Sequence, residues 1–355
     1  MTSARAPVSF TVRARTDLGR TRDHNEDAFL VADLGARSTD LTNGGPHKVG
    51  ERGTLFLVAD GMGGAAAGEL ASSMAADLIF RHLLERASTS PQADAEQFAQ
   101  QLRDAVEEAN EHIHAYSKDH PDVRGMGTTA TVAGVLQGTL YLAQVGDSRG
   151  YLVRDGVATQ LTKDQSLMQR LVDAGELTEE EAEQSERRNI ILQALGPDAK
   201  IRVDLSWQEL RRGDVLVICS DGLSGQVKRE EIAALVEQQP DLDALCDQLI
   251  MLANERGGPD NITVVAVRFD GDGLPPAGSS GEVGYRTMLN QETSETPAAI
   301  PARPPEPVVP PAENPPPPVV PAPPAPKRSG SPAAVAALTF GVIVLLTIFY
   351  FLLRR

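Results

Sequence analysis

The sequence has few cysteines. Among its 355 residues there are only two, Cys219 and Cys246. Two isolated thiols exclude a disulfide framework and a zinc motif, so the sequence fits a reducing compartment. Cys219 lies in an apolar run and Cys246 in a helix-like one, where buried and unreactive thiols are the ordinary expectation.

Clustered basic residues are also absent. The formal net charge is −16, and the 33 lysines and arginines are spread along the chain. A nucleic-acid-binding surface normally carries a basic patch, so nucleic acid is not an expected partner. The acidic balance also means that any phosphate site must be a local feature.

The two ends of the chain differ in hydropathy. The first ten residues lack the apolar stretch of a secretory signal. Residues 333–353 carry no charge and are long enough to cross a bilayer. Basic residues flank this stretch on both sides, so charge alone does not orient it. We expect a single-pass transmembrane helix in the cell membrane. Without a secretory signal, the large N-terminal part is expected in the cytoplasm.

A proline-rich stretch precedes the apolar segment. We predict one globular domain over residues 8–270 and a disordered linker over 271–332. Proline dominates residues 301–326, and such a composition favours extended polyproline II and cannot build a core. A tether is the simplest interpretation, and a ligand for an SH3-like domain is the alternative.

Hydrophobic periodicity predicts an α+β domain. Helical spacing of apolar residues covers 66–86, 98–113 and 241–255, and Thr178 with Glu181 predicts a capping box for a helix at 179–184. The runs 139–145 and 150–153 are interpreted as a hairpin joined through residues 146–149. Because strands cluster around hairpins, we expect antiparallel sheet covered by helices. Runs rich in β-branched residues predict strands at 54–59, 129–136, 139–145, 150–153, 214–219 and 262–269.

Four aspartates stand beside glycine, serine or asparagine at the ends of strand-like runs: Asp60, Asp147, Asp221 and Asp260. Mg²⁺ and Mn²⁺ prefer carboxylate oxygens, and a strand end holds a ligand rigidly. A glycine such as Gly61 lets the backbone pass close to an ion. One Asp-Gly pair is ordinarily a turn. Several converging carboxylates repel one another unless cations neutralise them, so the set predicts a metal centre.

The acidic stretch at 22–27 supplies further candidates. Glu26 and Asp27 could bind a metal directly or orient its waters. The planar guanidinium of Arg22 suits two phosphate oxygens at once. An ion pair of Arg22 with Asp23 or Glu26 is the alternative, and spacing alone does not decide between them.

Seven motifs follow one another along the chain: RDHNEDAF, LFLVADGMGG, GMGTTAT, VGDSRGYL, LTKD, CSDGLS and GGPDNITVV. In this order, over about residues 10–269, they resemble the metal-dependent protein phosphatases of the 2C type (PPM), in their bacterial Ser/Thr branch. The resemblance implies a four-layer α/β/β/α fold, two Mn²⁺ or Mg²⁺ ions in a cleft at one end of the β-sandwich, and a metal-activated water as nucleophile.

The resemblance also implies roles for the metal ligands. Asp60 would bridge both metals, and the carbonyl of Gly61 would bind one of them. Asp221 and Asp260 would complete the other metal. A third metal is often bound by bacterial members, and Asp122 matches the position that holds it together with Asp221. A solvated loop carboxylate is the alternative for Asp122.

Other residues gain supporting roles from the same resemblance. Glu26 and Asp27 would bind metal or orient its waters, and Arg22 would hold the substrate phosphate. Asn261 and Asp147 would act indirectly, by orienting the site.

One position departs from many eukaryotic members. Met62 stands where they have a histidine that is proposed as general acid, and His24 is no obvious substitute. The group that protonates the leaving oxygen is therefore not identified. Residues 160–195 resemble the mobile flap of bacterial members, which would lie over the edge of the cleft.

Together these features predict a membrane-tethered protein serine/threonine phosphatase that opposes Ser/Thr kinases. Its partners would be phosphorylated Ser/Thr proteins, including kinases and their substrates, and the enzyme itself would be monomeric. Two alternatives stay open. One is a two-metal phosphatase for small phosphoesters or for an anti-sigma antagonist, and the other is a non-catalytic scaffold that binds phosphoproteins.

Overall fold

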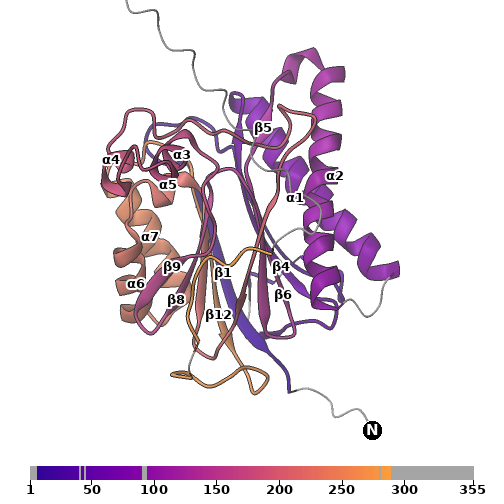
Figure 1. Ribbon diagram of the computed structural model, residues 1–355, viewed down its shortest axis with the longest axis vertical. Coiled ribbons are helices and arrows are strands. Elements are labelled where there is room, and N and C mark those ends of the chain that lie inside the picture. Colours follow the sequence, from indigo (N-terminus) through magenta and orange to yellow (C-terminus); the bar gives the residue numbers. More distant parts are fainter. Residues whose placement is uncertain (1–5, 40, 44, 90–93, 280, 289–355) are drawn as a thin grey trace, which may run out of the picture. The chain divides into compact units, whose positions relative to one another are not determined.

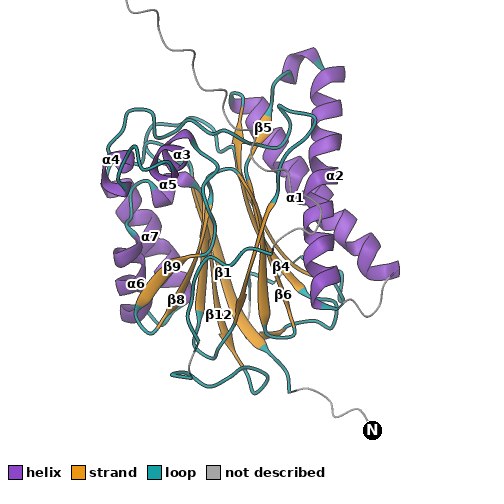
Figure 2. Ribbon diagram, in the orientation of Figure 1, coloured by secondary structure: helices purple, strands orange, loops and turns teal. Residues whose placement is uncertain are grey.

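Two antiparallel sheets lie face to face between two groups of helices in the computed structural model (Figure 1, Figure 2). The structure describes residues 6–39, 41–43, 45–89, 94–279 and 281–288. Every strand pairing among these residues is antiparallel. The predicted α+β class and the α/β/β/α layering are confirmed.

The first sheet has the order β3-β1-β12-β11-β8-β9. Its outer face is covered by α6 (Arg229–Gln238) and α7 (Leu242–Glu255). Tyr151, Val217 and Leu249 lie in the buried apolar layer between the sheet and these helices. The strands are β1 (Ser9–Asp17), β3 (His47–Lys48), β8 (Arg149–Arg154), β9 (Val157–Gln160), β11 (Val215–Cys219) and β12 (Ile262–Asp270).

The second sheet has the order β10-β7-β6-β4-β2, and the short β5 pairs with the end of β4. Helices α1 (Ala65–Thr89) and α2 (Ala95–Asp119) cover its outer face. A third apolar layer, with Phe56 and Phe269 in edge-to-face contact, fills the space between the two sheets. The strands are β2 (Asp27–Asp33), β4 (Thr54–Met62), β5 (Gly127–Thr128), β6 (Ala130–Leu136), β7 (Thr139–Val145) and β10 (Asp204–Glu209).

The helices follow their sequence signals. Apolar residues at helical spacing form the buried face of α2, including Phe98, Leu102 and Ile113. Thr178 and Glu181 form the predicted capping box of α4. The remaining helical turns are η1 (Pro121–Val123), α3 (Leu167–Asp173), α4 (Glu179–Glu183) and α5 (Asp221–Ser224).

The predicted hairpin of 139–145 and 150–153 is wrong. β7 pairs with β6 and β10, whereas β8 pairs with β11 and β9, so the two strands belong to different sheets. Nearly every residue of both strands is buried, because each strand has an apolar layer on both of its faces. Gly146, at a φ of 100°, begins the connection that crosses from one sheet to the other. This connection carries Asp147.

The predicted end of the domain at residue 270 is too early. Residues 281–288, called here the edge segment, lie along β10 at the open edge of the second sheet. The backbone of Trp207 donates to Arg286 O at 3.0 Å, and that of Met288 donates to Leu205 O at 3.0 Å. Part of the predicted linker thus covers a sheet edge, where unpaired backbone groups would otherwise remain.

Side chains reinforce this edge. Arg154 and Arg211 both donate to the carbonyl oxygen of Gly281, and Arg154 is itself held in a buried ion pair with Asp214. Val283 packs against the apolar layer between the sheets. The edge segment is therefore part of the folded domain.

Residue 280, residues 289–332 of the predicted linker and the predicted membrane span at 333–353 lie outside the described residues. Within the part of the chain that the structure describes, no helix is both long enough and apolar enough to cross a bilayer. The transmembrane helix stays a prediction.

The packing of Val283 yields a stability prediction. Val283→Asp places a charge against the sandwich interior, so we expect it to reduce the free energy of unfolding by about 1–3 kcal/mol. Thermal unfolding followed by fluorescence of Trp207, the only tryptophan, measures this. Thr287→Asp is the control, because Thr287 is exposed on the same segment. Equal melting temperatures for both variants would show that the edge segment does not support the fold.

Candidate metal centre

Asp27 and Asp60 form the core of the candidate site. They are directly opposite each other in the pairing of β2 with β4, so their side chains lie on the same face of the sheet. Thr129 holds the backbone of Asp60 from both sides. Its Oγ1 accepts from Asp60 N at 2.9 Å, and its own N–H donates to Asp60 O at 2.9 Å. The register of two strands thus places two carboxylates side by side.

Three further aspartates reach this place from other segments. Asp221 begins α5 directly after β11, Asp260 lies just before β12, and Asp147 lies in the connection between β7 and β8. Ser220 links its own segment to β2 and to β12, because its Oγ donates to Asp27 Oδ2 at 2.7 Å and accepts from Thr263 N at 3.0 Å.

Burial and mutual repulsion raise the pKa values of four of these carboxyl groups. Burial is the largest cause, and it raises the pKa of Asp221 to about 6, that of Asp27 to about 7 and that of Asp147 to about 8. The pKa of Asp60 lies well above its usual range, through burial and then repulsion by the other four carboxylates, Asp27, Asp221, Asp147 and Asp260. Asp60 is the electrostatic centre of the group.

Unpaired oxygens mark the same place. Asp27 Oδ1, Asp147 Oδ1 and Asp221 Oδ1 are buried and accept no hydrogen bond from the described residues. Buried carboxylate oxygens normally have partners, and hard divalent cations bind this type of oxygen. The donor set therefore fits Mn²⁺ or Mg²⁺. Among the described residues, no three or more His, Cys, Asp or Glu side chains are arranged as a group that could hold a metal ion. The assignment therefore depends on the mutual repulsion of the carboxylates and on their unpaired oxygens.

Two glycines permit the close packing around the site. A Cβ on Gly61 would collide with the carbonyl oxygens of Gly68 and Glu26, and a Cβ on Gly222 would collide with that of Asn261. Gly61 N also donates to Glu26 O at 3.1 Å. The residues after Asp60 and Asp221 must therefore be glycines, because any larger side chain would collide with neighbouring backbone.

The loop at 18–26 is fixed by Asn261. Its Oδ1 accepts from Glu26 N at 2.8 Å, and its Nδ2 donates to Leu18 O and to His24 O. Arg22, on this loop, donates through Nη2 to Asp260 Oδ2 at 2.8 Å. The ion pair of Arg22 is therefore with a site aspartate, and neither Asp23 nor Glu26 is its partner in this contact. The guanidinium stands at the rim of the carboxylate cluster.

Two other predicted residues lie less deeply. Glu26 is half-buried, and burial is the main cause of its raised pKa. Asp122 is exposed in η1, five residues before β5, which pairs with Gly61 and Met62. The structure thus brings Arg22, Asp27, Asp60, Asp147, Asp221, Asp260 and Asn261 together, whereas the metal role of Asp122 stays a prediction.

Sequence reasoning missed two residues that hold the ligands in place. Ser220 bonds Asp27, and Thr129 bonds the backbone of Asp60. Each lies inside a quoted motif, CSDGLS or GMGTTAT, but neither is a metal-ligand type. Only the three-dimensional arrangement shows their contacts.

The fold and the cluster together define a class. Five aspartate carboxylates from separate segments meet at one end of a β-sandwich with an arginine at the rim, as expected for a metal-dependent enzyme that acts on phosphate groups.

Comparisons with known proteins identify the family. Residues 32–262 match the family model described as Protein phosphatase 2C. The serine/threonine phosphatase stp of Listeria monocytogenes is 39% identical over 256 residues, which are 72% of this chain and 94% of that protein. The serine/threonine protein phosphatase PstP of Mycobacterium tuberculosis is 39% identical over 262 residues, 74% of this chain and 45% of that protein.

Solved structures agree. The serine/threonine phosphatase of S. agalactiae has a TM-score of 0.64 and 34% identity, and the match covers 73% of this chain and 99% of that one. The catalytic domain of PstP in complex with two manganese ions has a TM-score of 0.59 and 37% identity, over 74% of this chain and 99% of that one. The chain belongs to the protein phosphatase 2C family and is a metal-dependent serine/threonine phosphatase of the bacterial type, with Mn²⁺ or Mg²⁺ as its cofactor.

The raised pKa values predict how stability depends on pH and metal. Without divalent cations, the free energy of unfolding should fall as the pH rises from about 4 and level off between about 6 and 8, because the folded-state pKa values of Asp221, Asp27 and Asp147 lie near 6, 7 and 8. Above about pH 4 the unfolded chain ionises its carboxyl groups freely, whereas the folded chain must keep them protonated or bear their repulsion.

Thermal unfolding from about pH 5 to pH 8, with chelator and with Mn²⁺, measures this dependence. Mn²⁺ should remove the decline, because a cation offsets the repulsion. Asp60→Asn is the matched variant and should flatten the decline in chelator while gaining little from Mn²⁺. Wild-type curves that run parallel with and without Mn²⁺ would contradict the assignment.

Proposed function

We propose that this chain is a membrane-tethered phosphatase that hydrolyses phosphoserine and phosphothreonine in proteins with two divalent cations held by the carboxylate cluster. The observation that carries the proposal is the convergence of four aspartates, Asp27, Asp147, Asp221 and Asp260, on Asp60. The identity of the relatives supports the substrate class, since their names describe serine/threonine phosphatases.

Asp60 would serve both cations, and its position among the other four carboxylates supports this role. Asp221, Asp260 and the carbonyl of Gly61 would hold the ions with it, and Asp27 would bind an ion or its water. When bound, the cations supply an activated water and offset the negative charge of the phosphoryl oxygens. The side chains of this protein would hold the ions and orient the substrate phosphate.

Arg22 would place the phosphate. Its contact with Asp260 holds the guanidinium at the rim of the cluster, and a planar guanidinium suits two phosphate oxygens. Asn261 fixes the loop that carries Arg22, so the position of the clamp depends on a buried amide and not on a mobile side chain.

The residue after Gly61 is Met62, which has no proton to give to the leaving serine or threonine oxygen. The proton must therefore come from another group. Cys219 is not a nucleophile here, because burial raises the pKa of its thiol to about 12. A direct attack of water on phosphorus is consistent with this, and no phosphoenzyme is required.

Activity measurements on single variants test this proposal. Asp60→Asn should lower the turnover of a phosphothreonine peptide by orders of magnitude, because it removes the central carboxylate. Arg22→Lys should mainly raise KM, because the bidentate geometry is lost while the charge stays. Asp77→Asn is the control, because Asp77 is an exposed aspartate on α1 outside the cluster.

Substrate choice separates the alternatives. Faster turnover of nucleotides or small esters than of phosphoserine and phosphothreonine peptides would favour the small-ester phosphatase. Absence of any hydrolysis at saturating Mn²⁺, with binding of phosphopeptide retained, would favour the scaffold.

The proposed location depends on sequence alone. Residues 333–353 form an uncharged apolar stretch of the length that a bilayer requires, so we propose that they anchor the enzyme with its catalytic domain on the cytoplasmic side. An anchored phosphatase would meet membrane kinases and their substrates at high local concentration.

Fractionation of cells tests the anchor. The full chain should sediment with membranes and resist extraction with high salt, and a chain that ends at residue 332 should not. Protease added to intact spheroplasts should leave the catalytic domain whole. Recovery of the full chain in the soluble fraction would contradict the anchor without affecting the proposed chemistry.

A further inference from the structure

Gln165 stands where the chain leaves the sandwich and enters residues 166–201, called here the flap segment, which contains α3 and α4. Arg202 follows the flap segment and leads into β10. Gln165 is a buried glutamine with an exposed fraction of 7%. A buried amide is retained at low cost only when its polar groups have partners, so its contacts identify what it holds.

Every polar group of Gln165 is used. Its backbone N–H donates to Gly146 O at 2.8 Å, and its Oε1 accepts from Gly146 N at 3.1 Å. Its Nε2 donates to Arg202 O at 3.1 Å, and its carbonyl oxygen accepts from Leu192 N at 2.8 Å. One residue therefore joins both ends of the flap segment to Gly146, the neighbour of Asp147.

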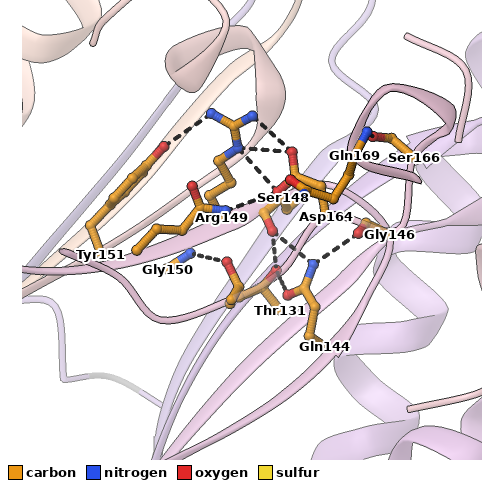
Figure 3. Close-up of polar contacts among 12 residues, drawn as sticks. Thr131, Gln144, Gly146, Ser148, Arg149, Gly150, Tyr151, Asp164, Ser166 and Gln169 are labelled. Atoms are coloured by element: carbon orange, nitrogen blue, oxygen red, sulfur yellow. Dashed lines mark hydrogen bonds and ion pairs between the residues drawn. The ribbon is translucent and has the colours of Figure 1, made fainter. Parts of the chain in front are cut away.

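Asp164, the residue before Gln165, binds Arg149 at the other end of the connection between β7 and β8. Asp164 accepts from Arg149 Nε at 3.0 Å and from Arg149 Nη2 at 2.8 Å, and Arg149 also donates to Tyr151 Oη (Figure 3). Asp164 and Gln165 thus hold Arg149 and Gly146, the residues on either side of the pair that includes Asp147.

The connection between β7 and β8, residues 146–148, also contacts Thr129, the residue that holds the backbone of Asp60. Ser148 Oγ lies 2.7 Å from Thr129 Oγ1, which accepts from Asp60 N. The carbonyl of Ser148 accepts from Gln144 Nε2 at 2.8 Å and from Thr131 Oγ1 at 3.0 Å (Figure 3). Hydrogen bonds and the short connection at 146–148 therefore link Gln165, at the start of the flap segment, to the backbone of Asp60.

We propose that Gln165 is a positioning residue that couples the flap segment to the carboxylate cluster through Gly146. This inference rests on the proposed function, because the role given to Gln165 is to keep the carboxylate cluster in the geometry that hydrolysis requires. A displacement of the flap segment reaches Gly146 through Gln165, and from there Asp147 and Asp60.

The chain offers a matched control for this role. Gln193 also joins the flap segment to Arg202, because its Oε1 accepts from Arg202 N at 2.7 Å. Within the part of the chain that the structure describes, Gln193 makes no hydrogen bond to Gly146. Gln165→Met and Gln193→Met each remove a glutamine amide at the base of the flap segment while they keep side-chain volume, but only Gln165→Met removes a hydrogen bond to Gly146, the one from Gly146 N.

The experiment compares both variants in the full chain with p-nitrophenyl phosphate, which is too small to bridge the flap segment and the site. We expect Gln165→Met to lower kcat by about 10-fold with little change in KM, and to weaken calorimetric Mn²⁺ binding several-fold, as outer partners of metal ligands do. Gln193→Met should leave kcat and Mn²⁺ affinity within about twofold of wild type.

The outcomes are separable from those of the proposed function. Equal changes in the two variants, or an unchanged kcat and Mn²⁺ affinity in Gln165→Met, would overturn the role of Gln165. If the wild type hydrolyses no substrate, the proposed function fails, and the Mn²⁺ affinities alone still decide whether Gln165 acts on the cluster.

A second variant covers the case in which Gln165→Met does not fold. Gln165→Glu keeps the oxygen that accepts from Gly146 and replaces the amide that donates to Arg202. Positioning through Gly146 predicts a kcat within about threefold of wild type. A loss as large as 10-fold would place the effect on Arg202 and contradict the proposal.

Discussion

Repulsion among five aspartates that meet at one end of the sandwich, four of them with buried carboxyl groups, is the constraint on which the rest of this structure depends. Each of these carboxyl groups would be more stable in water or apart from the others. The fold nevertheless brings them together around Asp60. Such an arrangement lowers the stability of the protein by itself and is retained because divalent cations make it favourable. The cluster is a cost to folding and a source of function at the same time.

The sandwich bears this cost through rigid connections close to the cluster. Cross-strand pairing sets Asp27 opposite Asp60, and Thr129, Ser220 and Asn261 fix the neighbouring backbone. Three apolar layers, one between the sheets and one under each pair of helices, hold the strands that carry these residues. The carboxylates therefore cannot relax away from one another without disturbing the core.

The sequence was informative where one residue type has one physical use. Runs of β-branched residues located β4, β6, β7, β11 and β12, and helical spacing located α2 and α7. The aspartates of the cluster could be selected because a carboxylate beside a glycine at a strand end suits a cation. The comparison with known proteins confirmed the family that the ordered motifs had indicated.

Features that depend on partners distant in the chain could not be predicted. A short link with glycine and serine suits a hairpin as well as a crossing between sheets, and only the packing of β7 and β8 on both faces decides. The edge segment has a polar composition like a linker, and its order comes from Gly281, Val283 and β10 acting together. Ser220 and Thr129 have side chains that no motif rule assigns to a metal site.

The most direct test of the central claim is a crystal structure of this protein grown with Mn²⁺, with anomalous difference maps at the manganese edge. The account predicts two manganese peaks within the aspartate cluster, with the carboxylate of Asp60 in contact with both and Asp221 and Asp260 on one of them. Peaks that avoid Asp60, or a cluster that binds no manganese at saturating concentration, would contradict it.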